Sequence, residues 1–183
     1  FEIYGPTGED KALTLSENES ITLQESDFGF ADINDSGRLR YVKITSLNIQ
    51  GSLTLNSEDV LVNDNIDVDD IPQLVFTPQA NQSGDNYSSF DLKLRNDTDN
   101  QENDLSEVAN TITFNVININ NQPQISGVPL TSVNEDSAYS FIPTVIDADV
   151  NDTTTFSIIN KPTWASFDTA TGLLSGTPTN GDV

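Results

Sequence analysis

Cysteine, methionine and histidine are all absent from this 183-residue sequence. Without thiols the chain cannot form disulfides, use a thiolate nucleophile or build a cysteine zinc site. Without histidine it has no Ser-His-Asp triad, no Cys-His pair and no imidazole ligand for a transition metal. Paired carboxylates, as in glycosidases, remain available, but acids are so common here that pairing by chance is expected. We therefore predict that the chain is not an enzyme.

Basic residues are also scarce: 7 Lys and Arg stand against 29 Asp and Glu, and the formal net charge is −22. Such a surface repels phosphate backbones and anionic lipids, so no nucleic-acid partner is expected. No apolar run approaches the ~18 residues of a membrane span, so membrane insertion is not expected either. The acidity has two interpretations that composition does not separate. It can be a solvated surface, as in halophilic proteins, or a set of hard oxygen ligands for Ca²⁺.

Apolar residues alternate in short runs, which is the pattern of half-buried strands, and helical periodicity is almost missing. Gly, Pro, Asn, Asp and Ser separate these runs and favour tight turns. The pattern predicts an all-β chain of Ig-like, cadherin-like Greek-key β-sandwiches. The acidic stretch Asn63–Asp70 lacks the Gly and distal Glu of an EF-hand loop, and we interpret it as a surface loop. The predicted strands are Ser20–Leu23, Leu39–Ile44, Ser52–Leu55, Asp59–Val62, Gln73–Thr77, Ser89–Leu94, Thr111–Ile117, Ala138–Phe141, Thr144–Ile146 and Thr155–Ile159.

The run Asn118–Pro123 interrupts the strand pattern, which restarts at Ile125. Pro123 cannot donate to a strand ladder and biases Gln122 toward an extended conformation. We interpret residues 118–123 as a short, stiff linker between a sandwich at 9–117 and a partial sandwich at 124–183. Residues 1–8 are interpreted as a tail or as the end of a preceding repeat, and the chain as a fragment of a longer protein.

The two predicted domains also resemble each other. Ser16–Leu23 aligns without gaps on Asn134–Phe141, and each segment is followed by an acidic Asp-x-(Asn/Asp) step. These steps begin at Asp32 and at Asp147. The same order of features twice in one chain indicates a tandem repeat of roughly 115 residues.

The second domain resembles a dystroglycan-type cadherin-like repeat, a group also known as the He-PIG or Ig-like domains of bacterial surface proteins. The stretches that carry this resemblance are Val133–Asp136, Asp147–Asp149, Lys161–Asp168 and Thr171–Pro178. The first domain, over residues 9–121, resembles the cadherin-like repeats of large bacterial adhesins. Its matching stretches are Asp27–Asp32, Gly51–Leu55 and Leu74–Pro78.

These resemblances imply a long secreted or surface-anchored protein whose domain junctions bind Ca²⁺. A repeat of the second type normally continues into two further strands that this sequence does not contain. The second sandwich is therefore expected to be incomplete, with unpaired strand edges that invite fraying or a neighbouring chain.

The resemblance to cadherins also implies a set of Ca²⁺ ligands at the junction, from the first domain, the linker and the second domain. Their neutral Asn members imply fewer or weaker ions than a full cadherin joint. These junction residues are Glu17, Asp85, Asn118, Asn120, Asn121, Asp147 and Asp149. Asp32, Asn34 and Asp97 are implied as a half-site toward a preceding repeat, and Glu135 toward a following one. For each residue the alternative is a solvated turn acid or an Asx-turn.

The predicted function is that of a Ca²⁺-stiffened extender or adhesion segment of a bacterial surface adhesin. Its expected partners are neighbouring repeats of the same polypeptide and a cell-surface protein or polysaccharide. Two alternatives stay open: a carbohydrate-binding module and a homotypic association module. Trp164 is either a sugar-stacking platform or a packed core residue, and its place within the family-like stretch favours packing.

Overall fold

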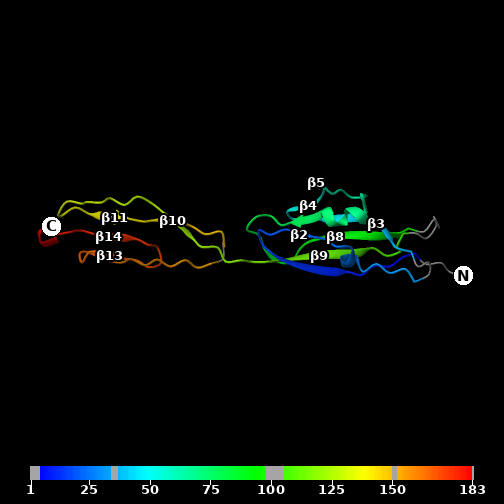
Figure 1. Cartoon of the computed structure of the whole chain (residues 1–183). Coiled ribbons are helices and arrows are strands. Elements are labelled where there is room, and N and C mark those ends of the chain that lie inside the picture. The colour runs from blue at the N-terminus through cyan, green and yellow to red at the C-terminus, as the bar shows by residue number, and fades with distance from the viewer. Residues whose placement is uncertain (1–4, 34–36, 98–104, 150–151, 183) are drawn as a thin grey trace. The chain divides into compact units, whose positions relative to one another are not determined.

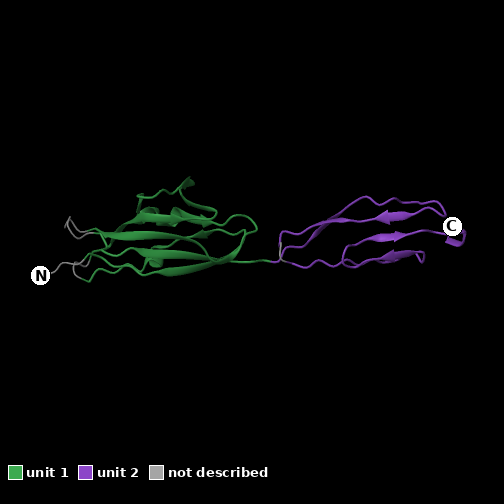
Figure 2. Cartoon of the chain, turned by 180° about the vertical axis from the view of Figure 1, so that it is seen from behind, with its two compact units in different colours: residues 1–119 green, residues 120–183 purple. Residues whose placement is uncertain are grey.

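Strands make up nearly all of the regular structure in the computed structural model, which describes residues 5–33, 37–97, 105–149 and 152–182 (Figure 1). The chain divides into two compact units, Phe1–Ile119 and Asn120–Val183 (Figure 2). Three short 3₁₀ helices, at Glu25–Phe28, Val68–Gln73 and Asn180–Asp182, accompany the strands. Among the described residues, no helix is long and apolar enough to cross a membrane.

Unit 1 contains two sheets. In the first, β1 runs parallel to β9, while β8 pairs antiparallel with both β9 and β3. The order of this five-stranded sheet is β1 (Lys11–Ser16), β9 (Asn110–Ile117), β8 (Gly84–Asn96), β3 (Leu39–Asn48) and β6 (Asn65–Asp67). The order of the second, antiparallel sheet is β2 (Ile21–Thr22), β7 (Leu74–Thr77), β4 (Ser52–Leu55) and β5 (Glu58–Asp59).

The core of unit 1 is built from the inward-facing residues of these sheets. Ile112, Phe114 and Val116 alternate with more exposed residues along β9 and are buried, as the sequence pattern predicts. Phe114 stacks on Phe76 of the other sheet with ring centroids 3.9 Å apart. Burying each such ring contributes roughly 1.5–3 kcal/mol to folding, so these contacts hold the two sheets together.

Unit 2 has much less regular structure. β10 (Gln124–Ser126) pairs with β12 (Thr144–Ile146), and β14 (Leu174–Gly176) lies between β11 (Tyr139–Phe141) and β13 (Ala165–Phe167). Among its described hydrophobic residues only Tyr139 and Ala165 are buried. The large exposed hydrophobics of unit 2 are Ile125, Val128, Leu130, Ile142, Ile146, Ile158 and Ile159.

The predicted all-β, Ig-like sandwich class is confirmed. The strands at Ser52–Leu55 and Thr144–Ile146 have their predicted bounds, whereas β3 and β8 extend well beyond the predicted runs. The strand β1 was not predicted, although Leu13 and Leu15 alternate in it as Leu53 and Leu55 do in Ser52–Leu55. It forms because β9 supplies a full ladder of partners for it.

Three local predictions are wrong. Asn63–Asp70 is not a surface loop: it contains β6, in which Ile66 is fully buried, and the start of a 3₁₀ helix capped by the Asp67 side chain. The strand predicted at Asp59–Val62 is reduced to β5: Glu58 and Asp59 pair with β4 and the Val60 N–H donates to the Leu53 carbonyl, but the Leu61 N–H already donates to the Asp64 side chain. Thr155–Ile159 forms no strand, and the Phe156 N–H donates to the Thr169 carbonyl instead of to a neighbouring strand.

Candidate functional site

Two of the predicted junction acids lie at the end of unit 1 where β9 finishes. The Glu17 backbone N–H donates to the carbonyl of Ile117 over 2.9 Å, and the Glu17 side chain is 3% exposed. Asp85 is exposed and directly follows Gly84, which pairs with Val116 in β9. The fold therefore brings Glu17 and Asp85 to the same end of unit 1.

An asparagine pair fixes the turns beside these acids. Asn18 and Asn81 both have positive φ, 62° and 56°, a conformation that Asn tolerates better than most residues. The Asn18 side-chain amide donates to Asn81 Oδ1 over 3.0 Å, and the Asn81 N–H donates to Asn18 Oδ1 over 2.9 Å. Sequence reasoning missed this pair, because its two members are 63 positions apart.

Four junction residues fall within unit 2, and hydrogen bonds link all four of them in a chain. The Asn121 N–H donates to Asp149 Oδ2 over 2.5 Å, and the Asp149 N–H donates to Asp147 Oδ1 over 3.0 Å. Asp149 is only 9% exposed, so this carboxylate is held in a largely dry setting. Asn120 is exposed, and its side-chain amide donates to the Asn121 carbonyl. Asn118, which belongs to unit 1, is exposed and follows β9.

The unit 2 set offers the oxygen types that Ca²⁺ prefers: two carboxylates, Asn side-chain carbonyls and backbone carbonyls. In the described part of the chain, no three acidic side chains cluster closely enough to hold a metal ion by themselves. Any cation here would therefore depend on amide and main-chain oxygens as well as on Asp147 and Asp149.

The residues predicted as a half-site toward a preceding repeat lie at a different end of unit 1. Asp32 accepts a hydrogen bond of 2.8 Å from the side-chain amide of Asn96, which is buried. The adjacent Asp97 is exposed and exchanges hydrogen bonds with the backbone of Arg38. Asn34 lies outside the described residues. The structure thus brings Asp32 and Asp97 together through Asn96, which sequence reasoning did not single out.

Glu135, predicted to face a following repeat, is exposed and accepts a hydrogen bond from the Asn180 side chain.

Two other acids of unit 2 accept hydrogen bonds within local turns. Hydrogen bonds from the Ala170 N–H and from Thr171 hold the pKa of Asp168 below its ordinary value. The Thr179 N–H and hydroxyl do the same to the pKa of Asp182. These acids serve turn geometry, as the Asx-turn alternative anticipates.

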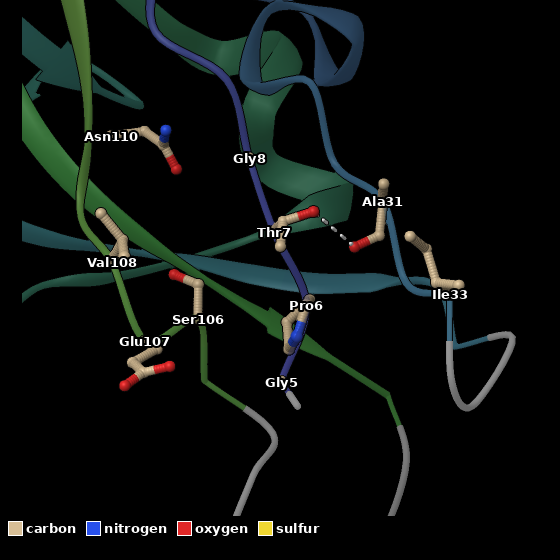
Figure 3. A pocket seen from close by; sticks show the side chains of 10 residues that line it. All are labelled: Gly5, Pro6, Thr7, Gly8, Ala31, Ile33, Ser106, Glu107, Val108 and Asn110. Carbon is tan, nitrogen blue, oxygen red and sulfur yellow. Dashed lines mark hydrogen bonds between the residues drawn. The ribbon is translucent and has the colours of Figure 1, made fainter. Parts of the chain in front are cut away.

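A pocket of about 480 Å³ opens in unit 1 beside the start of β9 (Figure 3). Its walls come from three segments, and the Thr7 backbone pairs with Ala31 across it. Ser106 is buried and its hydroxyl accepts a hydrogen bond from the Leu94 N–H, so that hydroxyl is engaged in the fold. The lining residues are Gly5, Pro6, Thr7, Gly8, Ala31, Ile33, Ser106, Glu107, Val108 and Asn110.

A second pocket, of about 300 Å³, lies in unit 2 beside Trp164. The Trp164 ring packs edge-on against Tyr139, with ring centroids 5.9 Å apart and an interplanar angle of 78°. Trp164 is half-buried, and its ring carbon Cε3 also lies beside Gly176. Packing therefore accounts for Trp164 better than a free, flat sugar platform does.

These features define the class of the protein: it is an all-β chain of Ig-like and cadherin-like sandwich architecture. Residues 122–183 match the He_PIG family model, described as "Putative Ig domain". This match confirms the Ig-like resemblance inferred for residues 124–183. No curated protein matches the sequence.

The solved structures that match this chain include a protocadherin and a CEACAM protein. The crystal structure of the Protocadherin GammaB4 extracellular domain superposes with a TM-score of 0.51 and 16% sequence identity. The match covers 97% of this chain but only 30% of that one. Murine CEACAM1b gives a TM-score of 0.27 and 11% identity, covering 97% of this chain and 87% of that one. At 16% identity the likeness to the protocadherin extends to the fold alone, and it supports the cadherin-like sandwich.

Proposed function

We propose that this chain is a structural and adhesion module of an extracellular bacterial surface protein, and that Ca²⁺ stiffens it. Sandwiches of this architecture are common in cell-surface proteins, where they act as spacers and binding modules rather than as enzymes. The expected partners are neighbouring repeats of the same polypeptide and a cell-surface protein or polysaccharide.

The observation that carries the calcium proposal is the contact between Asn121 and Asp149. It ties the asparagine-rich segment that leads into unit 2 to the Asp-x-Asp step of that unit, with a hydrogen bond of 2.5 Å. The Asp147 carboxylate in turn accepts a hydrogen bond from the Asp149 backbone N–H. The carboxylates and amides are thus ordered, and an ordered set of hard oxygen ligands binds Ca²⁺ at a smaller entropic cost than a disordered one.

The proposed mechanism is electrostatic. In a chain of net charge −22 the carboxylates repel one another, and a divalent cation bound by Asp147, Asp149 and neighbouring amide and main-chain oxygens reduces that repulsion. Ca²⁺ that binds only the folded chain stabilises it by about 2.7 kcal/mol when its free concentration is 100 times the Kd. Stiffening follows because the bridged segments lose their freedom to move independently.

Isothermal titration calorimetry of the full chain with CaCl₂, together with thermal unfolding in CaCl₂ and in EDTA, tests this proposal. We expect binding, a higher Tm in CaCl₂ and a longer particle in solution scattering. Asp85→Asn and Asp147→Asn should each weaken the response. Asp59→Asn, an exposed acid in β5 outside the predicted ligand set, is the matched control. Identical behaviour in CaCl₂ and EDTA would refute the calcium proposal.

A further inference from the structure

Most of the positive charge of this acidic chain lies on two neighbouring strands of unit 1. The chain has seven Lys and Arg residues, and four of them are on β3 and β8, which pair antiparallel in the five-stranded sheet (Figure 1). They are Arg40 and Lys43 on β3, and Lys93 and Arg95 on β8. In a chain with 29 Asp and Glu, these two strands depart locally from the overall charge.

These side chains share the outer face of the sheet. Successive side chains in a strand point to opposite faces, so residues that alternate with core residues point outward. The core residues of this stretch are Val42, Ile44, Leu92 and Leu94, all fully buried. The outward residues are Tyr41, Lys43, Lys93 and Arg95, and each is part-exposed. A bulge at the register shift before Tyr41 places the exposed Arg40 beside them.

Two of these cations stand together without a counter-charge. Lys43 and Lys93 are directly opposite each other in the β3–β8 ladder. Side chains at such positions have Cβ atoms roughly 4.5–5.5 Å apart, and like charges there destabilise a sheet. In the described part of the chain the ion pair is Lys11–Asp27, and neither Lys43 nor Lys93 is paired with a carboxylate. The Lys93 ammonium donates instead to the main-chain carbonyl of Glu107 over 2.9 Å.

The next row of the same face combines an aromatic ring with a cation. Tyr41 and Arg95 are directly opposite each other, two residues along the strands from the lysine pair, which is roughly 7 Å. The Arg95 guanidinium lies 5.6 Å from the Tyr41 ring centroid, and one of its N–H groups donates to the Tyr41 hydroxyl over 3.3 Å. These contacts keep the ring and the guanidinium in place on the sheet.

Acids on the same strands do not cancel this charge. Asp91 also points outward, and its carboxylate accepts a hydrogen bond of 2.7 Å from the Thr111 hydroxyl. Asp67 of β6 is opposite Tyr41, and its carboxylate accepts the Asp69 N–H. The four cations outnumber these two acids. At physiological salt the charges of distant acids are screened beyond about 8 Å, so the nearby cations set the field at the lysine pair.

The chemistry of the surrounding face indicates what kind of anion fits it. The cores of protein–protein interfaces are apolar, whereas the outward neighbours of the lysine pair carry hydroxyls and amides. These neighbours are Ser89, Thr111, Thr113 and Asn115. Two copies of a chain of net charge −22 repel each other, which disfavours a second copy as the partner. Hydroxyls, amides, a tyrosine and unpaired lysines are complementary to a sugar chain that carries anionic groups.

We propose that the outer face of β3 and β8 binds an anionic polysaccharide, and that Lys43 and Lys93 together hold one of its carboxylate or sulfate groups. A sugar ring packs beside Tyr41, and the neutral side chains of β9 bind the sugar hydroxyls. This site rests on the proposed adhesion role and names the class of its partner. It lies within unit 1 and does not use Ca²⁺.

Calorimetric titration of the full chain with polygalacturonate, dextran sulfate and neutral dextran, in EDTA and at low ionic strength, tests the site. We expect at least one of the charged polymers to bind, which distinguishes carboxylate from sulfate recognition, and neutral dextran not to bind. Lys43→Gln with Lys93→Gln should weaken the binding at least about tenfold. The matched control, Lys11→Gln with Lys161→Gln, removes the same charge elsewhere and should bind like the parent.

A single charge reversal separates binding from folding. Lys43→Glu places an acid opposite Lys93, so an opposite-charge pair replaces the like-charge pair. We expect this variant to unfold at a higher temperature than the parent by circular dichroism and yet to lose polymer binding. A lower unfolding temperature would contradict the uncompensated lysine pair from which the site is inferred.

The proposal would be overturned if neither charged polymer bound, or if the two double variants bound equally well. It would also be overturned by a dimer at low salt that Lys43→Glu dissociates, because the acidic surface of a second copy would then be the occupant. All of these measurements are made in EDTA. Their failure therefore leaves the calcium proposal standing, and failure of the calcium proposal leaves this site standing.

Discussion

Replacing Asp149 by alanine should destabilise unit 2 even when no Ca²⁺ is present. The carboxylate accepts the Asn121 N–H over 2.5 Å and is only 9% exposed, so water replaces this bond poorly. A hydrogen bond to a charged group contributes about 1.5–3 kcal/mol, and the part-buried Asn121 N–H would lose this acceptor. We therefore expect Asp149→Ala to lower the free energy of unfolding of unit 2 by about 2 kcal/mol.

Urea unfolding in EDTA, followed by tryptophan fluorescence, measures this loss. The chain has one tryptophan, Trp164, and it lies in unit 2, so its emission reports on that unit alone. Asp149→Asn keeps an acceptor oxygen and should lose about 1 kcal/mol less than Asp149→Ala. Asp152→Ala, an exposed acid of the same segment, should stay within about 0.5 kcal/mol of the parent.

The reasoning would be refuted if Asp149→Ala and Asp152→Ala unfolded at the same urea concentration. It would also be refuted if Asp149→Ala shifted only in CaCl₂, because the contact with Asn121 would then contribute nothing without the ion.

Three further predictions concern a turn of unit 2, the core of unit 1 and the loss of stability at low pH. Gly172→Ala should destabilise unit 2 by about 1–3 kcal/mol, because φ is 71° and an added Cβ would lie 2.8 Å from neighbouring side chains. Gly181→Ala, where the space is open, should be neutral by the same Trp164 assay. Phe114→Ala should cost unit 1 about 3–5 kcal/mol by circular dichroism and leave the tryptophan transition unmoved; a shift in both would contradict two independent units. The pKa of Asp168 is lowered from 3.8, so its contribution is present above that pH and is lost as the pH falls through the native pKa. Asp168→Asn should therefore make the free energy of unfolding of unit 2 depend less on pH in the acid range. An unchanged dependence would show that Asp168 does not contribute to it.

Much of the fold follows from local patterns in the sequence. Alternation in Thr111–Ile117 gives the buried face of β9, and turn residues separate the strands. A strand with several apolar positions carries its own signal, because one face must be buried wherever it pairs. The strand β6, with Ile66 as its one apolar residue, carries little signal and forms because β3 accepts its backbone groups.

The candidate calcium site also has a part that the sequence indicates and a part that only the folded structure shows. The resemblance to cadherins, together with residue type, singles out Asp147, Asp149 and the asparagine run before Gln122 as candidate oxygen ligands. Order does not show that Asn121 donates to Asp149, or that Asn96 holds Asp32. Those contacts join residues far apart in the chain, and only the folded backbone brings them within hydrogen-bond distance.

The sequence by itself determines that this protein is an all-β, strongly acidic chain without thiol or imidazole chemistry, because composition and two-residue periodicity are local properties. The tertiary structure alone decides which apolar segments become strands. Leu39–Ile44 pairs with β8 and grows into a ten-residue strand, whereas Thr155–Ile159, equally well patterned, has no neighbour and remains irregular. A strand is stable only when another strand satisfies its backbone, and that partner is a property of the fold.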